Sequence, residues 1–338
     1  MRHDFMVIRW SMLALVCGGA LACKRSPTDE QAALSVPPIP AIDERCAPPD
    51  SRVCVGDDVV ACEANGVLGR RIQACHEGCE AGKCNATCAD DGVGLIYVVD
   101  SAAELLSFDP RKLPGDPFER IGTLQCAARG GPFSMAVDRH GAAWVVYGDG
   151  QMFKVSISDA SCRPTTFRPT TRFGMGFVTD TPGSSTEKLW LASDDTNHVL
   201  SFLDTTQRAL APQRVGSVAG MDELNPELTG TSEAKLYGFY PMTGKPSYVQ
   251  EISRSNGAPK GPRWNLGKAP LDQVQAYAFA QWGGVFYIFV TTYNDDFSLN
   301  STVRALDRAT GSYRTVLEHL PYRITGAGVS TCAPERDQ

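Results

Sequence analysis

The sequence predicts an all-β protein, a five-bladed β-propeller that is closed by its C-terminal strand and preceded by a small disulfide-rich module. Three observations predict it. An apolar run with an aromatic residue recurs five times, at steps of about 47, 46, 47 and 50 residues, a period typical of blades or solenoid units. A dense group of cysteines precedes the first run. Near the C-terminus, a strand-like segment follows the last aromatic run, and no further aromatic run comes after it.

Residues 1–23 are predicted to be an export signal. They begin with basic residues and continue into a short apolar segment, residues 12–22, that ends in small side chains, as signal peptides do. This segment is too short to span a bilayer as a helix. Its end resembles a bacterial lipobox, so Cys23 is the predicted lipidation site, although Ala20 stands where a lipobox usually has Leu. Secretion without a lipid is the alternative.

Residues 24–45 are predicted to be a Pro-rich tether, because prolines without aromatic residues favour an extended, poorly ordered chain. The whole chain has a formal net charge of −6 and an isoelectric point near 5.5. This balance argues against a nucleic-acid partner, which requires a basic face. No later apolar run reaches the length of a spanning helix, so membrane contact is expected only through the N-terminal lipid.

Residues 46–88 are predicted to form the disulfide-rich module. The stretch is too short to build a stabilising core by itself, and it holds the cysteines Cys46, Cys54, Cys62, Cys75, Cys79, Cys84 and Cys88. In an exported chain such cysteines form disulfides, and the first six can pair in fifteen ways. A zinc site is the alternative, but free thiolates are disfavoured in an oxidising compartment and the spacings are not typical of zinc ligands. No metal and no cofactor is predicted.

Residues 89–334 are predicted to form the propeller. The five apolar runs are Ile96-Tyr97-Val98-Val99, Ala143-Trp144-Val145-Val146, Leu189-Trp190-Leu191-Ala192, Leu236-Tyr237-Gly238-Phe239 and Phe286-Tyr287-Ile288-Phe289. A second strand with alternating polarity follows each run, over residues 105–109, 151–157, 198–204, 247–253 and 301–307. A strand rich in small residues precedes four of the runs, over residues 134–138, 175–180, 227–231 and 276–281.

The first and last segments of this region complement each other. The first run has no small-residue strand before it, and the segment Ile324 to Ser330 has no run after it. We therefore expect the C-terminal strand to complete the first blade, which would hide sheet edges that must otherwise be guarded. Gly176, Gly230 and Gly328 suit innermost strands that crowd around an axis. Two poorly patterned stretches, 158–173 and 222–233, leave four or six blades as alternatives.

The remaining cysteines predict two further disulfides. Cys332 ends the C-terminal strand and Cys88 lies just before the strand beside it, so a Cys88–Cys332 bridge is expected. Cys126–Cys162 follows by elimination. In a regular blade these two cysteines would lie at opposite ends, beyond the reach of a disulfide, so an irregularity in the first two blades is also expected.

Several segments carry a resemblance to a known group of proteins. They are Pro132-Phe133-Ser134-Met135-Ala136-Val137-Asp138-Arg139-His140-Gly141, Phe173-Gly174-Met175-Gly176-Phe177, Glu227-Leu228-Thr229-Gly230-Thr231, Ala278-Phe279-Ala280-Gln281-Trp282-Gly283-Gly284 and Gly326-Ala327-Gly328-Val329-Ser330-Thr331-Cys332-Ala333-Pro334. The chain resembles uncharacterised exported proteins of myxobacteria over most of residues 89–334. The Cys-rich module is similar to small modules in lipoproteins of the same bacteria. The resemblance implies origin and export, and it transfers no catalytic residue.

Ligands of propellers usually bind at the mouth, the end of the ring where the innermost strands begin. The predicted ligand-binding residues there are Asn225, Glu227, Gln275, Tyr277 and Arg323. A glycosidase would need two carboxylates at the mouth, and the sequence offers Glu227 and Asp272. The chain contains no G-x-S-x-G elbow, and no catalytic residue is predicted.

The other acidic residues are expected to have structural roles. Asp138 and Asp180 end their strands and should bond local backbone N–H groups in turns. The acidic stretches 194–197 and 294–296 hold oxygen ligands of the kind that Ca²⁺ prefers, but without the spacing of an EF-hand loop. The repeated aromatic residues are expected to pack between blades.

The predicted function is a non-enzymatic binding or interaction module for an envelope protein or a glycan. The predicted location is extracytoplasmic, as an outer-membrane lipoprotein or at the periplasm or cell surface. This function is a fold-level inference. The alternatives are a carbohydrate-active enzyme of the glycoside-hydrolase kind that uses Glu227, and a purely structural envelope component.

Overall fold

The computed structural model describes residues 45–56, 58–74, 79–80, 82–84, 88, 92–218, 225–242, 245–266 and 274–336. The predicted signal, most of the tether, Cys23, Cys75 and Asp272 lie outside these residues. The described part contains β-strands and one 3₁₀ helix, η1 (Pro110–Lys112), and it has no α-helix. The predicted all-β class is confirmed.

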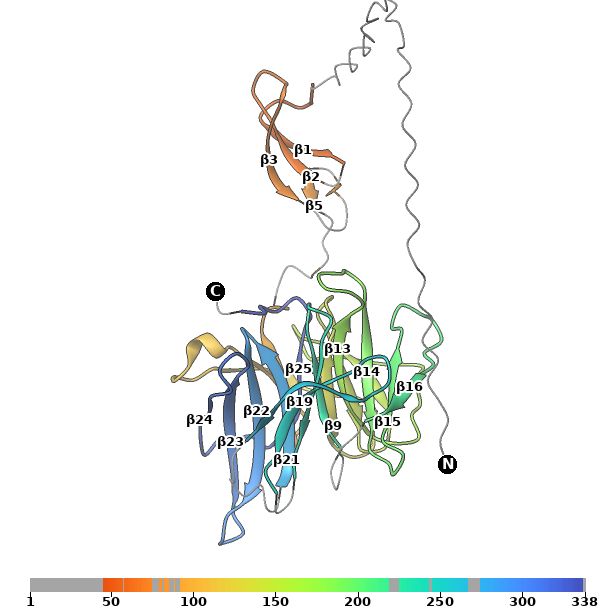
Figure 1. The fold of residues 1–338 in the computed structure, drawn as a ribbon, viewed down its shortest axis with the longest axis vertical. Helices are drawn as coiled ribbons and strands as arrows, with labels where there is room; N and C mark the ends of the chain where they lie inside the picture. Colours follow the sequence, from red (N-terminus) through yellow and green to blue (C-terminus); the bar gives the residue numbers. More distant parts are fainter. Residues whose placement is uncertain are drawn as a thin grey trace, which may run out of the picture. The chain divides into compact units, whose positions relative to one another are not determined.

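Five antiparallel sheets of four strands make up the repeat region (Figure 1). One has β9 (Pro132–Val137), β10 (Ala142–Tyr147), β11 (Met152–Ser156) and β12 (Cys162–Pro164). The next has β13 (Phe173–Thr179), β14 (Glu187–Ser193), β15 (Val199–Leu203) and β16 (Gln213–Ser217). The third has β17 (Glu227–Gly230), β18 (Leu236–Tyr240), β19 (Tyr248–Ile252) and β20 (Pro259–Asn265). The fourth has β21 (Val274–Trp282), β22 (Val285–Tyr293), β23 (Leu299–Asp307) and β24 (Tyr313–Leu317).

The fifth sheet joins the two ends of the repeat region. Its strand order is β25-β6-β7-β8, with β6 (Ile96–Asp100), β7 (Glu104–Phe108), β8 (Phe118–Thr123) and β25 (Ile324–Val329). The C-terminal strand pairs antiparallel with the first apolar run, so that Gly328 lies opposite Tyr97. The predicted pairing of the last strand with the first is therefore present.

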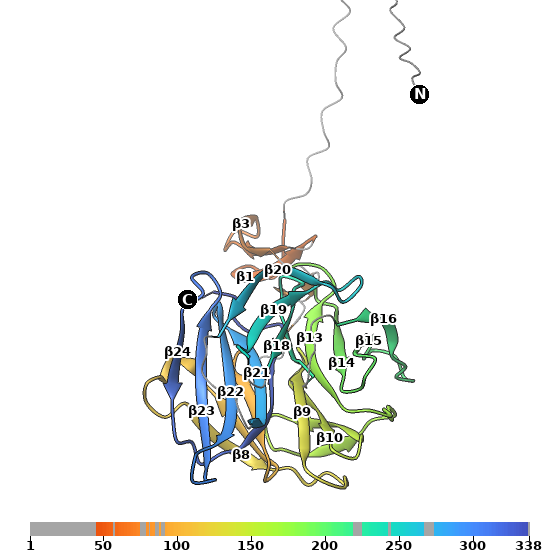
Figure 2. The same cartoon turned by 60° about the horizontal axis from the view of Figure 1, so that its bottom comes forward.

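The first strands of the sheets, β9, β13, β17, β21 and β25, lie beside one another. Each contacts the first strand of the next sheet, and β25 contacts both β21 and β9. Figure 2 shows β9, β13 and β21 toward the middle of the repeat region and β16, β23 and β24 toward its outside. Small residues permit this approach: a Cβ atom at Gly230 would lie 2.0 Å from the Phe177 carbonyl oxygen.

The repeated aromatic residues are core residues, as predicted. Tyr97, Trp144, Trp190, Tyr237 and Tyr287 are all buried. They occupy the second strand of each sheet, where the pleat directs alternate side chains toward neighbouring sheets. Burial of such large side chains supplies much of the favourable free energy of folding.

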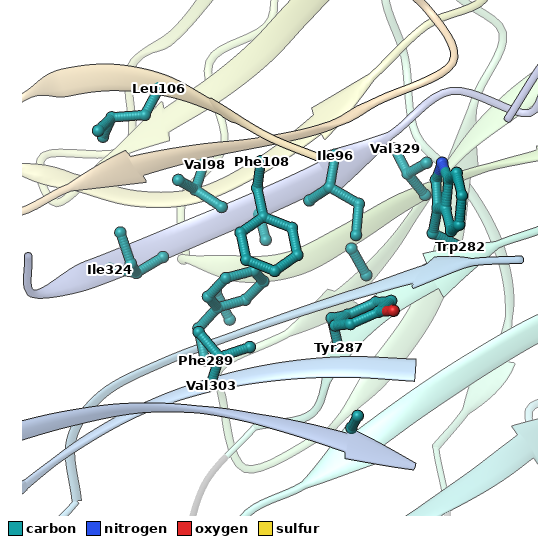
Figure 3. Packing of buried hydrophobic residues seen from close by; sticks show 14 of the residues in the cluster. Ile96, Val98, Leu106, Phe108, Trp282, Tyr287, Phe289, Val303, Ile324 and Val329 are labelled. Atoms are coloured by element: carbon teal, nitrogen blue, oxygen red, sulfur yellow. The ribbon is translucent and has the colours of Figure 1, made fainter. Parts of the chain in front are cut away.

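The sheet that contains both chain ends packs tightly against its neighbour. Phe108 of β7 lies between two aromatic residues of β22, with ring centroids 5.4 Å from Tyr287 and 5.3 Å from Phe289. Figure 3 shows these rings together with Ile96 and Ile324, which come from β6 and β25. The strand supplied by the C-terminus therefore shares a hydrophobic core with strands from both ends of the repeat region.

The Cys-rich module has its own small sheets. β1 (Ser51–Val55), β2 (Asp58–Cys62) and β3 (Leu68–Ala74) form one sheet, and β4 (Cys79–Glu80) pairs with β5 (Lys83–Cys84). Disulfides join Cys46 to Cys62 and Cys54 to Cys79. The side chain of Cys84, like the whole of Cys75, lies outside the described part of the chain.

The two disulfides predicted for the repeat region are both present, Cys88–Cys332 and Cys126–Cys162. An irregularity in the β9–β12 sheet accompanies the Cys126–Cys162 bridge, because β12 has only three residues. The register shift between β7 and β8 is not specific to this bridge, since the third and fourth strands of three other sheets show the same shift. Four disulfides in the described residues indicate an oxidising, extracytoplasmic compartment, because cytosolic thiols are kept reduced.

Candidate functional site

A cavity of about 350 Å³ opens where the first strands of the five sheets begin. This volume is at the lower end of the range for small-molecule sites. We call it the mouth cavity, and its walls are Ser101, Gly131, Pro132, Phe133, Gly148, Arg172, Glu227, Gln275, Ala276, Tyr277, Arg323 and Thr325. These residues come from all five sheets or from the segments directly next to them.

Four of the five predicted ligand-binding residues line the mouth cavity: Glu227, Gln275, Tyr277 and Arg323. The fifth, Asn225, contacts one of them, since the Tyr277 hydroxyl donates to the Asn225 backbone carbonyl at 2.8 Å. They meet because each belongs to a first strand or to the residues just before it. The sequence pattern does not single out Arg172 or Ser101, which also line the cavity. These two lie in connections without periodicity, so only the folded arrangement identifies them.

Glu227 is the one carboxylate among the described residues of the cavity wall. Its side chain is 2% exposed and accepts a hydrogen bond from the Ser134 hydroxyl, which reaches it from β9. Burial raises the pKa of Glu227 well above its usual value, and hydrogen bonds from Ser134 and from the Met175 backbone offset only part of this effect. The buried environment therefore favours the neutral, protonated acid.

Asn225 and Tyr277 form a polar network behind the cavity wall. The amide orientation of Asn225 is assigned from its neighbours: with the nitrogen toward Asp194, it donates to Asp194 Oδ1 at 3.3 Å and to the Tyr277 hydroxyl at 3.0 Å, and the amide oxygen accepts from the Gly174 backbone at 3.3 Å. Burial raises the pKa of Tyr277 well above its usual value, and the nearby Glu227 and Asp194 add to the shift. The Tyr277 hydroxyl therefore stays a neutral donor and holds the wall in place.

Two guanidinium groups belong to the cavity wall. Arg172 pairs with Asp194 at 2.9 Å and lies over the Phe133 ring at 4.7 Å, so its charge is balanced. Arg323 Nη2 donates to the Gln275 carbonyl at 2.7 Å, and its buried Nε has no hydrogen-bond partner. The two arginines therefore differ in charge compensation.

The opposite end of the first strands is covered by the segment after β25. Thr331 donates to Glu187 Oε2 at 2.6 Å, and Glu187 Oε1 accepts from the Arg139 backbone at 2.8 Å. Glu335 accepts from the Ser232 backbone at 2.7 Å and pairs with Arg308 at 3.0 Å. This segment therefore connects three different sheets, which the sequence pattern does not predict.

The acidic turns have the local contacts of ordinary turns. Asp138 Oδ1 accepts from the backbones of His140 and Ala142 at 3.0 and 2.9 Å, as predicted, whereas the Asp180 carboxylate lies 3.7 Å from Lys188 Nζ. In the two stretches weighed as calcium sites, a carboxylate accepts from a nearby backbone N–H, Asp195 from Asn197 and Asp296 from Ser298. Across the described ranges, no three His, Cys, Asp or Glu side chains gather as a metal site would require.

None of the helices in the described part of the chain combines the length and the apolar character that crossing a bilayer requires.

No protein-family model matches the chain, and no curated protein matches it. Several solved structures are similar at low identity, among them three bacterial proteins. The extracellular domain of a putative hybrid two-component system from Bacteroides thetaiotaomicron has 12% identity and a TM-score of 0.38, over 71% of this chain and 34% of that one. This chain thus spans about a third of that protein's chain.

The second similar structure is an endo-arabinase from Bacteroides thetaiotaomicron, with 12% identity, a TM-score of 0.39 and coverage of 54% of this chain and 78% of that one. The third is a putative TolB from Agrobacterium tumefaciens, with 13% identity, a TM-score of 0.40 and coverage of 71% and 82%.

Proposed function

We propose that the five four-stranded sheets are the blades of a five-bladed β-propeller that β25 closes. Three observations support this arrangement. Each first strand contacts the next, and β25 contacts both of its neighbours, β21 and β9. The last strand pairs with β6 of the first blade. The Cys88–Cys332 disulfide joins residues 244 positions apart beside that pairing.

We propose that the protein is a non-enzymatic binding module that recognises a glycan of the cell envelope through the mouth cavity. The observation that carries this proposal is the composition of the cavity wall, to which all five sheets contribute. Half-buried aromatic residues, an amide, hydroxyl groups, two guanidinium groups and the Glu227 carboxyl surround one small cavity. Apolar walls with a few fixed polar groups are typical of ligand sites.

A hydrolase is the alternative that this wall supports less well. Glycoside hydrolysis requires an acid and a second carboxylate on either side of the scissile bond. Within the described residues, Glu227 alone supplies a carboxylate to the cavity wall, and it is hydrogen-bonded to Ser134. Asp194 is the carboxylate of the adjoining network, but it pairs with Arg172. The site therefore suits binding better than acid–base chemistry.

The proposal also includes export and a lipid anchor at Cys23. The disulfides of the described residues require an oxidising compartment, and the first 23 residues have the pattern of a signal peptide with a lipobox-like end. A lipid at Cys23, followed by the tether of residues 24–45, would hold the propeller at the surface of a membrane in the cell envelope.

The binding proposal is tested on a glycan array with the full chain and with a Tyr277→Ala variant, which removes an aromatic wall of the cavity. We expect the full chain to bind a defined set of glycans and the variant to lose that signal. Tyr293→Ala, at an exposed aromatic residue outside the cavity wall, serves as the matched control. Binding to no glycan would contradict the proposal and favour a protein partner. Release of sugar from a bound glycan would favour a hydrolase that uses Glu227.

A further inference from the structure

We propose that the mouth cavity binds a sugar unit that carries a carboxylate, and that the Arg323 guanidinium recognises this group. The inference rests on the proposed function, because it names the class of ligand for the same cavity. It comes from the charges of the cavity wall, their partners and the shape of the site.

Within the described ranges, Arg323 is the charged residue of the cavity wall that lacks an oppositely charged partner. Among the residues that the structure describes, no carboxylate lies within 4.0 Å of Arg323, whereas Arg172 has Asp194 as its partner. The Arg323 side chain makes one hydrogen bond to the described part of the chain, from Nη2 to the Gln275 carbonyl oxygen, which fixes the side chain but brings no negative charge. Because Nε is buried, the two Nη groups are the N–H donors left for a ligand, and their planar fork matches a carboxylate.

Glu227 does not supply the missing negative charge. Its carboxyl is buried and hydrogen-bonded to Ser134, and the raised pKa keeps the neutral form favoured. With Glu227 neutral and Arg172 paired, the cavity wall has a net positive charge at Arg323. An anionic ligand group would balance this charge, whereas a cationic group would be repelled.

The remaining walls fit a sugar ring better than a purely apolar ligand. Phe133 and Tyr277 are only partly exposed and line the cavity with apolar ring atoms, against which the C–H face of a sugar ring can pack; one face of Phe133 is covered by Arg172. The hydroxyl groups of Ser101 and Thr325 can exchange hydrogen bonds with sugar hydroxyls. The volume of about 350 Å³ limits the occupant to a small unit, such as the end of a glycan chain.

The test uses titration calorimetry with the full chain and matched pairs of monosaccharides. Glucuronate, galacturonate and mannuronate are compared with glucose, galactose and mannose, which differ from them only in the carboxylate. We expect at least one uronate to bind about tenfold or more tightly than its neutral partner, because a hydrogen-bonded charged group contributes this much. Arg323→Gln should remove the difference. Arg214→Gln, at an exposed arginine on the outer strand β16, should leave it unchanged.

The outcomes separate this inference from the proposed function. Neutral sugars that bind as tightly as uronates would overturn the carboxylate inference and leave the glycan-binding proposal intact. Binding of neither class would overturn the carboxylate inference, and the glycan array then decides the glycan-binding proposal separately. Preference for uronates that persists in Arg323→Gln would overturn the role of Arg323. If this variant does not fold, titration of the unchanged protein in rising sodium chloride gives the answer. Uronate affinity should then fall with salt and neutral-sugar affinity should not.

Discussion

Protonation of the buried Glu187 carboxyl makes the stability of the fold depend on pH. It accepts hydrogen bonds from Arg139 and Thr331, yet burial raises its pKa from the usual 4.5 to about 7. Between these two values the folded protein holds a proton that the unfolded chain has lost. The free energy of unfolding therefore decreases as the pH rises through this window, and the effect is complete above pH 7.

We predict that Glu187→Gln reduces the loss of stability between pH 5 and pH 8. Each pKa unit corresponds to about 1.4 kcal/mol, so the pH-dependent loss should shrink by about 3 kcal/mol. Urea unfolding at several pH values measures this difference. The pKa of Glu227 is raised in the same direction. Because Glu227 is present in both proteins, its contribution to the pH dependence cancels when the two are compared.

Glu119→Gln is the matched control for Glu187→Gln, because the Glu119 side chain is 74% exposed. It should leave the pH profile unchanged. A profile of Glu187→Gln that runs parallel to that of the unchanged protein would show that this carboxyl does not control the pH dependence.

The candidate site was predictable where position in a repeat determines position in space. Glu227, Gln275, Tyr277 and Arg323 lie at or just before the starts of first strands, so a repeat of known period places them together. Ser134 and Glu187 were not predictable as partners of buried groups. Ser134 contacts Glu227 over 93 residues, and Glu187 contacts Thr331 over 144 residues. Both contacts join different sheets, and a local sequence pattern does not predict contacts between residues so far apart.

At the scale of the strand, the first strands pack so closely that side chains cannot fit between them. A Cβ atom at Gly230 would lie 2.0 Å from the Phe177 carbonyl oxygen, and one at Gly328 would lie 2.8 Å from the Ala136 backbone. These neighbours are backbone atoms, which cannot move aside to admit a Cβ atom as the end of a flexible side chain can. The small residues of these strands are therefore required by packing.

We predict that Gly230→Ala lowers the free energy of unfolding by about 2 kcal/mol or more, as overpacking does. Gly94→Ala is the matched control, because a Cβ atom at Gly94 would meet no other atom within 4 Å. Its effect should stay within about 0.5 kcal/mol. Equal stability of the two variants, measured by chemical unfolding, would contradict close packing of the first strands.

The inner two strands of each sheet were predictable because their signals are strong. Aromatic runs and small residues recur with one period, and the structure places strands at every predicted run. Outer strands lack such signals, since one side of them faces solvent. β20 is almost entirely exposed and β12 has only three residues, so neither shows a periodic pattern. Their positions follow from pairing with the strands inside them.

At the scale of the whole molecule, the proposed lipid anchor predicts where the protein is found in the cell. Cys23→Ala should move the protein from the membrane fraction to the soluble extracytoplasmic fraction, because the lipid is the only proposed membrane contact. Fractionation together with metabolic labelling by a fatty-acid analogue measures both effects. Cys126→Ala, which removes a disulfide cysteine, controls for the loss of a cysteine. Membrane association of Cys23→Ala would contradict the anchor.

The pairing of β25 with β6 has a consequence for the order in which the exported chain is completed. A chain that leaves the cytoplasm from its N-terminus delivers β6 first and β25 last, with more than 220 residues between them. During translocation the backbone of β6 has an unpaired edge that invites aggregation or chaperone capture. A chain that stops before Cys332 cannot form the Cys88–Cys332 disulfide. Formation of the Cys88–Cys332 disulfide therefore requires that the segment after β25 has already crossed the membrane.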